Sequence, residues 1–156
     1  MKSFSLRVAS EQDIPKIVGL NRLMADYHHE IDPFWKPGSE LESFNDYLSA
    51  ELSKKNTLWV LAEVEGVTVA YFSAEIIPAK PAISEKMVGH ISNGFVLERY
   101  RGKGIAKGAI AMILNWFREQ GVKVAELSVD SRNGQGVRAW EGLGFKEYMK
   151  KMKMNL

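Results

Sequence analysis

The feature that most constrains this chain is the segment RGKGIA at residues 101–106, which joins two patterned stretches. The apolar run 94–97 before it is typical of a strand, and the apolar spacing over 105–120 is typical of a helix that ends at Gly121. The first amides of a helix have no partner within the helix, and the helix dipole places positive charge there. Glycines let neighbouring N–H groups converge on one anion. The segment therefore predicts a phosphate-binding turn.

This turn has two other interpretations. Glycines between a strand and a helix can serve as a plain connection that needs only a positive φ. A dinucleotide fingerprint or a phosphate loop is excluded by spacing, because the third glycine would fall at Lys107 and no Gly-Lys-Ser/Thr ending follows. Positive charge favours phosphate binding over a plain connection, and it comes from Arg99, Arg101, Lys103 and Lys107.

Composition limits the function classes. A length of 156 residues predicts one domain, residues 1–156, and 46% apolar with 26% charged residues is ordinary for a soluble globular protein. A net charge of +2 is too small to imply nucleic acid, so no nucleic-acid partner is expected. The absence of cysteine excludes a disulfide framework and a thiolate metal site, and it fits a cytoplasmic location. We see neither a signal peptide nor an apolar run of the roughly 20 residues that cross a bilayer, so no membrane association is expected.

Hydrophobic periodicity predicts an α/β fold with mixed strand directions. A capping box starting at Ser10 marks the first helix, and two prolines break the pattern over 28–38. Glu65-Gly66 predicts a hairpin turn. The predicted strands are 4–8, 58–64, 67–77, 88–97, 124–129 and 145–154, and the predicted helices are 10–27, 41–54, 105–120 and 133–142.

Two motifs resemble those of the GNAT acetyltransferase superfamily. The segment 96–106 is similar to its acyl-CoA motif, Arg/Gln-x-x-Gly-x-Gly/Ala. Asn133 followed by AWEGLGF at 139–145 resembles its second signature, Asn…Tyr-Glu-Lys-Leu-Gly-Phe. The order of the predicted elements is similar to that of the family from Phe4 to the C-terminus. Both motifs together are far more specific than either motif alone.

The resemblance implies a mixed, mostly antiparallel sheet flanked by helices on both faces and splayed between strands 88–97 and 124–129. Acetyl-CoA, the co-substrate, would lie in that gap and pass its acetyl group directly to a primary amine in a ternary complex, which makes the protein an N-acetyltransferase. In the family the turn holds the pyrophosphate and the preceding strand pairs with the pantetheine arm. The implied acyl-CoA contacts are Phe95, Val96, Arg101, Gly102, Lys103, Gly104, Ile105, Ala106 and Asn133.

Amine acetylation needs a base more than it needs an acid. An amine with a pKa near 10.4 carries a handicap of about 4–5 kcal/mol at neutral pH, whereas a thiol with a pKa near 8.5 leaves as thiolate at a cost of roughly 2 kcal/mol. The candidate bases are Glu75, His90, Asn93 acting only through water, and the cluster His28, His29, Glu30 and Asp32. Family bases commonly lie on the central strands, which favours Glu75 and His90. The alternatives are a solvated strand position for Glu75 and a strand cap for His90.

Trp140 departs from the family, because the tyrosine proposed as the acid aligns with it. Three outcomes stay open: water protonates the thiolate, Tyr148 or Tyr100 substitutes, or the protein is a non-catalytic acyl-CoA sensor. A packing role is the preferred interpretation of the indole itself.

The acceptor would lie near the proline-rich break. The substrate-binding candidates are Tyr27, His28, Phe34, Trp35 and Asn93, and a hydrophobic plug is the alternative. The sequence 28–32 contains two histidines, but they point in different directions on a helix and no third ligand follows, so no metal is expected. The acceptor itself, a small-molecule or peptide amine, stays open. Exposed apolar residues on the terminal strand also make a homodimer an option.

Overall fold

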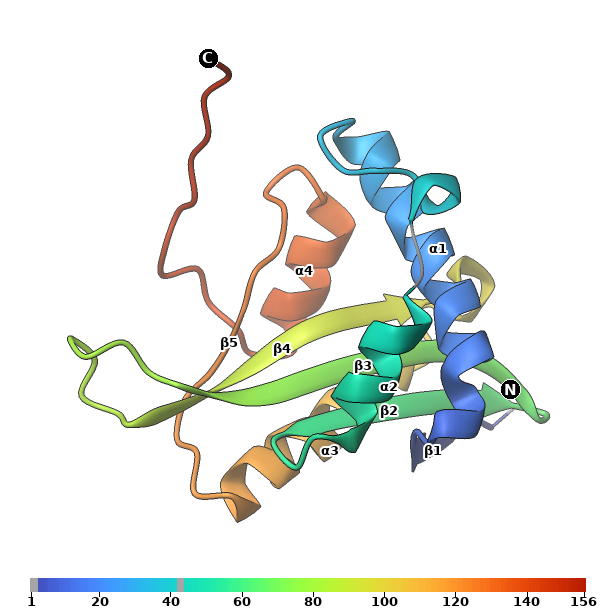
Figure 1. Ribbon diagram of the computed structural model, residues 1–156, viewed down its shortest axis with the longest axis horizontal. Coiled ribbons are helices and arrows are strands. Elements are labelled where there is room, and N and C mark those ends of the chain that lie inside the picture. The colour runs from blue at the N-terminus through green and yellow to red at the C-terminus, as the bar shows by residue number, and fades with distance from the viewer. Residues whose placement is uncertain (1–2, 42–43) are drawn as a thin grey trace.

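The structure is a computed structural model that describes residues 3–41 and 44–156, and it contains one open five-stranded sheet. The strands follow one another in the order β1-β2-β3-β4-β5, and every pair is antiparallel except the parallel pair β4–β5 (Figure 1). Their bounds are β1 Ser5–Val8, β2 Thr57–Val64, β3 Val67–Pro78, β4 Met87–Val96 and β5 Ala125–Leu127. The helices are α1 Ile14–Ile31, α2 Asn45–Ser53, α3 Ile105–Glu119 and α4 Gly134–Gly142, with single 3-10 turns at Glu11–Asp13, Gly38–Glu40 and Glu98–Tyr100. The prediction of a mixed, mostly antiparallel sheet is confirmed.

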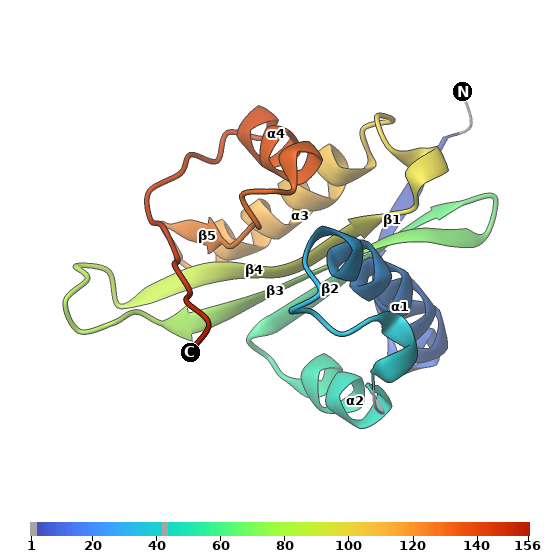
Figure 2. The same cartoon turned by 90° about the horizontal axis from the view of Figure 1, so that it is seen from above.

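Helices cover both faces of the sheet: α1 and α2 lie on one side and α3 and α4 on the other (Figure 2). Strand side chains alternate between the faces, so each helical layer has its own core. Val60 and Phe72 belong to the core on the α3 side, which includes Ile113. Leu61 and Tyr71 belong to the core on the α1 side, with the buried side chains Ile17, Leu20 and Leu48.

The hairpin and the first helix illustrate how local chemistry sets the elements. Glu65 and Gly66 both have positive φ, 50° and 78°, as the tightest hairpin turn requires. At the helix start, the Asp13 carboxylate accepts a hydrogen bond from the Ser10 backbone N–H at 2.9 Å, as the capping box predicts. Arg7 on β1 donates a hydrogen bond to each oxygen of the same carboxylate at 2.7 Å, and this contact joins the first strand to the first helix.

Helix α1 is longer than predicted, since it continues to Ile31 rather than ending near Tyr27. His28 and His29 are compatible with the last turn, where the helix dipole favours positive charge, and the first residue that forbids a helix is Pro33. The second predicted helix, 41–54, begins only at Asn45, and its residues 42–43 lie outside the described residues. Strand β5 is also shorter than the predicted 124–129.

The predicted terminal strand, 145–154, is wrong as a strand of this chain's own sheet. Residues 145–156 are extended but belong to no strand in the described structure, and Met152 and Met154 are 90% and 79% exposed. The alternating sequence suits a strand, but a strand also needs a neighbouring edge along its whole length. The segment instead leaves the body of the molecule close to β5 (Figures 1 and 2).

Candidate functional site: a glycine turn and an open strand edge beside an acidic pocket

The sheet opens where β4 and β5 part. The two strands pair at only three positions, from Gly89 opposite Ala125 to Ile91 opposite Leu127, where β5 ends. Strand β4 continues without this neighbour over residues 92–96, so one side of its backbone is open there. A splayed sheet of this kind is what the acyl-CoA motif implied, and an extended ligand arm can add to such an edge as a strand would.

The glycine turn follows directly after this open edge. Gly102 and Gly104 have φ of 72° and 83°, and Gly104 is the N-cap of α3. The first α-helical bond that leaves the cap runs from the Gly108 N–H to the Gly104 carbonyl at 3.0 Å. The amides of residues 105–107 precede it and point out of the helix start. The geometry fits a diphosphate, because free amides and the helix dipole act at one place.

Arg101 links the end of β4 to α4. Its Nε donates to the Val96 carbonyl at 2.9 Å, and a terminal nitrogen donates to Gln135 Oε1 on α4 at 2.9 Å. The guanidinium also lies 5.3 Å from the centre of the Tyr27 ring. A ligand that pairs with the Val96 carbonyl must compete with Arg101. Once displaced, the guanidinium is free to face a phosphate.

Asn133 has a structural role that the sequence did not reveal. Its Oδ1 accepts from the Gly136 N–H at 3.0 Å, which caps α4, and from the Tyr27 hydroxyl at 2.8 Å. Two predicted site residues, one a cofactor contact and the other an acceptor contact, are therefore joined directly. The amide nitrogen of Asn133 remains as the group that a ligand arm can use.

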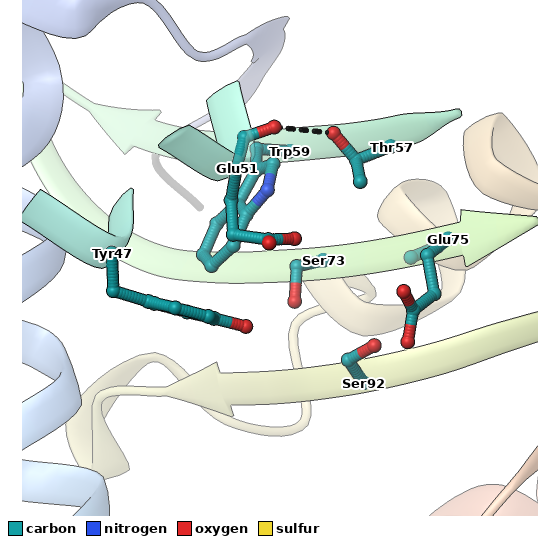
Figure 3. A pocket seen from close by; sticks show the side chains of 8 residues that line it. Tyr47, Glu51, Thr57, Trp59, Ser73, Glu75 and Ser92 are labelled. Carbon is teal, nitrogen blue, oxygen red and sulfur yellow. Dashed lines mark hydrogen bonds between the residues drawn. The ribbon is translucent and has the colours of Figure 1, made fainter. Parts of the chain in front are cut away.

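A pocket lies on the α2 side of the sheet, next to the open part of β4 (Figure 3). Its walls come from α2 and from strands β2 to β4: Tyr47, Glu51, Thr57, Trp59, Ser73, Ala74, Glu75 and Ser92. Figure 3 shows the Glu75 carboxylate, the Ser92 hydroxyl and the Tyr47 ring directed into a common space. The irregularity in the β3–β4 register between Ser73 and Ala74 falls at this point. Such bulges re-aim side chains and are frequent next to binding sites.

The pocket is acidic. Glu51 is only 8% exposed and its carboxylate pairs with Lys54. Burial, followed by the charges of Glu51 and Glu75, raises the pKa of Tyr47. Ser73 accepts a hydrogen bond from Asn93 Nδ2 at 2.7 Å, so Asn93 holds in place a side chain that lines the pocket. Negative charge beside hydroxyl groups and aromatic rings suits a cationic amine.

The two candidate bases are neighbours. Glu75 on β3 pairs with His90 on β4, so both side chains project from the same face of the sheet. Glu75 lines the pocket, whereas His90 is not among the residues that form its walls. The His90 Nδ1 is buried and has no hydrogen-bond partner in the described part of the chain. Placement alone therefore favours Glu75 as the group that meets an amine.

The other acceptor candidates gather at the C-terminal end of α1, outside this pocket. His28 packs beside Tyr27 and Trp35, with ring centres 5.9 and 6.3 Å away, and burial lowers its pKa. Phe34 and Trp35 are 70% and 52% exposed. Among the described residues, no group of three or more His, Cys, Asp or Glu side chains is arranged to hold a metal ion.

Trp140 packs rather than pointing into free space. Its indole lies 3.3 Å from the position that a Cβ on Gly94 would occupy, and its ring meets Phe145 edge-on at 5.7 Å. Of the two hydroxyl substitutes, Tyr148 donates to Glu126 Oε2 at 2.7 Å, which raises its pKa and makes it a weaker acid. The Tyr100 ring lies beside Lys103, 5.1 Å from its centre to Nζ.

Sequence reasoning missed most of the pocket. Tyr47, Glu51, Trp59 and Ser73 gave no motif, because they come from three separate elements. One signal was available: Glu51 lies three residues after the buried Leu48 on α2, so an acidic side chain falls on the helix face that is turned to the sheet.

Comparison with known proteins agrees with this fold. A tetramutant of the BH1408 protein from Bacillus halodurans has the same fold, with a TM-score of 0.87 and 20% identity over 97% of this chain and 99% of that one. The aminoglycoside N-acetyltransferase AAC(6')-Iy in complex with CoA gives a TM-score of 0.77 and 18% identity over 100% and 96%. A predicted acetyltransferase with acetyl-CoA from Clostridium acetobutylicum gives 0.75 and 21% over 98% and 96%. No curated protein is similar enough in sequence to be matched with the chain.

In the described chain, none of the helices combines the length and apolar character of a membrane span.

A family model settles the relationship that the fold suggests. The model of the acetyltransferase (GNAT) family matches residues 20–145, which include most of α1, the hairpin, the glycine turn and α4. The chain therefore belongs to the GNAT family of acetyltransferases.

Proposed function

We propose that this protein, acting as one domain over residues 1–156, transfers an acetyl group from acetyl-CoA to a primary amine on a small cationic molecule. The observation that carries the proposal is the position of Ser92. It belongs both to the part of β4 that β5 leaves open and to the wall of the acidic pocket. A thioester on the open edge and an amine in the pocket would therefore meet across one strand.

Acetyl-CoA supplies the activated acetyl group, and this chain supplies its binding surface. The amides of 105–107 receive the diphosphate, while Arg101 and Lys103 add positive charge around it. The open backbone at Phe95 and Val96 pairs with the pantetheine arm after Arg101 releases the Val96 carbonyl. Binding along β4 holds the thioester in line with the pocket, and that placement provides much of the catalysis.

The pocket binds the amine and removes its proton. Glu75, whose carboxylate is not paired with a lysine as that of Glu51 is, attracts an ammonium group and accepts its proton. Removing this proton overcomes the larger of the two costs of the reaction, amine deprotonation and thiolate departure, since the protonated amine carries a handicap of about 4–5 kcal/mol at neutral pH. The thiolate leaves with water as its proton source, because Trp140 has no acidic proton to offer.

The test is CoA release with a panel of amines: amino acids, a peptide, a lysine derivative, polyamines and aminoglycosides. Small polycations should be the best acceptors. Glu75→Gln should lower kcat/KM by on the order of 10²-fold and remove the acid-side limb of the pH profile, on which activity rises with pH as the base loses its proton. Glu119→Gln, on the exposed end of α3, is the matched control and should change neither. Full activity of Glu75→Gln at every pH would show that Glu75 is not the base.

A sensor is the second candidate function, and the packing of Trp140 on Gly94 favours it. The indole takes the position of the family's acid and lies against the open part of β4. Saturable acetyl-CoA binding with no CoA release across the whole amine panel would support the sensor. Sustained release with any one amine excludes it.

A further inference from the structure

The ammonium group of Lys153 lies in a small cation site at the C-terminal end of α1. Its Nζ is 2.6 Å from Asp32 Oδ2 and 3.9 Å from the centre of the Phe34 ring. Proteins bind alkylammonium groups with these two kinds of partner, a carboxylate oxygen and the face of an aromatic ring. Lys153 therefore marks the position that the charge of such a ligand would take.

The site is built by residues that lie outside the C-terminal segment, which comprises residues 146–156. Asp32 is only 9% exposed, and its Oδ1 accepts a hydrogen bond from the Phe34 N–H at 3.1 Å, which fixes the carboxylate next to the ring. The Trp35 ring meets the Phe34 ring edge-on, with 5.9 Å between their centres. The carboxylate and the ring are thus held together without any help from Lys153.

The charges at the site do not balance without Lys153. Arg132 donates to Asp32 Oδ2 at 2.6 Å and to Asp130 Oδ2 at 2.8 Å, so one guanidinium serves two carboxylates. Lys153, followed by Arg132, holds the pKa of Asp32 well below its usual range, so Asp32 is ionised. Removing Lys153 leaves one more negative than positive charge among these groups, and a free cation would restore the balance.

Lys153 is a tethered occupant that is easily released. Residues 146–156 belong to no helix or strand in the described structure, and the Lys153 side chain is 51% exposed. The segment also touches β5, where the Tyr148 hydroxyl donates to Glu126 at 2.7 Å. An ion pair with one exposed partner contributes little, and a group on a short flexible tether has an effective concentration on the order of millimolar. A free ammonium compound at millimolar concentration therefore competes with Lys153.

We propose that Asp32 and the Phe34 ring form a binding site for a linear alkyl polyamine, which Lys153 occupies in the free protein. The end of a polyamine presents the same group as Lys153, a primary ammonium on an unbranched methylene chain. A polyamine carries two or more such charges on a slim chain, which favours it over a single amine at a site with surplus negative charge. When it binds, the C-terminal segment is released from α1.

This site is separate from the acidic pocket, whose walls include neither Asp32 nor Phe34. Binding here goes beyond acetyl transfer and does not depend on it.

Release of the C-terminal segment is measured by NMR with methyl-labelled methionines, because Met152 and Met154 flank Lys153. The probe is putrescine, and butanediol is its uncharged counterpart. Millimolar putrescine should move both methionine signals toward their positions in Lys153→Gln, in which the segment is already released. Butanediol should move neither signal.

Affinity is measured from the indole N–H signal of Trp35, which lies next to the Phe34 ring. Lys153→Gln has no tethered competitor, so it should bind putrescine roughly two- to fivefold more tightly than the native protein does. Lys151→Gln, on the same exposed segment, is the matched control and should bind as the native protein does. Phe34 is 70% exposed, so Phe34→Leu should keep the native melting temperature but bind putrescine about two- to fivefold more weakly, the loss of an exposed cation–π contact.

Glu75→Gln separates this site from the acidic pocket, and it should show the full response to putrescine. Methionine signals that do not respond to millimolar putrescine overturn the proposal. Equal putrescine affinity in Lys153→Gln and the native protein overturns it as well, and so does a response that disappears in Glu75→Gln. None of these readouts requires acetyl transfer, so a protein that acetylates no amine still tests the site.

Discussion

The glycine turn allows a change that acts on backbone geometry alone. Gly104 has φ of 83°, and a Cβ built on it meets nothing within 4 Å. Gly104→Ala therefore introduces no clash, only the cost of holding a side-chain residue in the left-handed region, about 1–2 kcal/mol. The chain either keeps the turn and loses that stability, or relaxes the turn and re-aims the amides of 105–107.

Both outcomes are measurable, and Gly19 provides the matched control. A Cβ on Gly19 also meets nothing within 4 Å, but Gly19 lies inside α1, where alanine gains about 0.5–1 kcal/mol over glycine. Unfolding in urea should show Gly104→Ala less stable and Gly19→Ala more stable than the native protein. Calorimetric titration with acetyl-CoA should show roughly tenfold weaker binding, about 1.4 kcal/mol, for Gly104→Ala alone.

The combination of results decides the interpretation. A Gly104→Ala protein that is as stable as the native protein and binds acetyl-CoA equally well would refute the reasoning, because a turn that is kept costs stability and a turn that relaxes moves the phosphate contacts. Weaker binding in Gly19→Ala would show that the effect is not specific to the turn.

Three further changes probe other parts of the structure. Asp13 is buried, and Arg7 holds the pKa of its carboxyl well below the usual range. The ionised carboxylate therefore stabilises the fold above the unfolded-state pKa near 4, and this stability is lost as the pH falls through the lower pKa of the folded state. Asp13→Asn should lower the unfolding free energy by about 2–3 kcal/mol at pH 7, and denaturant titrations should show a weaker dependence of that free energy on acid pH. Trp140→Tyr supplies a hydroxyl acid, yet kcat should rise by less than about thirtyfold, because thiolate departure costs only about 2 kcal/mol at neutral pH; a larger gain measured by CoA release would mean that leaving-group protonation limits the native protein. Tyr27→Phe removes the hydroxyl that donates to Asn133 Oδ1 and should cost about 1 kcal/mol in thermal unfolding, while Tyr47→Phe, on the pocket, should leave stability nearly unchanged.

Local patterns predicted most of the fold. The alternation of strands β2 and β3, the Glu65-Gly66 turn and the glycines before α3 each specify their backbone within a few residues, so the sequence alone is sufficient there. The predicted end of α1 falls too early because histidines and acidic residues at 28–32 resemble a loop but are compatible with a last helical turn. The tail at 145–154 has strand periodicity, but pairing depends on an edge that no local pattern encodes.

The same distinction between local and long-range patterns applies to the candidate site. The turn at 101–106 is contiguous, so the sequence alone is enough to assign its amides to an anion. The pocket joins Tyr47 and Glu51 on a helix to Ser73, Glu75 and Ser92 on two strands, and only the register of the sheet brings them together. The link between Tyr27 and Asn133 spans the first and the last helix, and no local pattern encodes it for the same reason.

The central claim is that the open β4 edge and the turn after it bind an acyl-CoA, and thermal unfolding with and without acetyl-CoA tests it most directly. A ligand at 100 times its Kd stabilises the folded state by about 2.7 kcal/mol, so millimolar acetyl-CoA should raise the melting temperature by several degrees. The rise should disappear when acetyl-CoA is replaced by an acetyl thioester that lacks the nucleotide. An unchanged melting temperature at millimolar acetyl-CoA would contradict the claim.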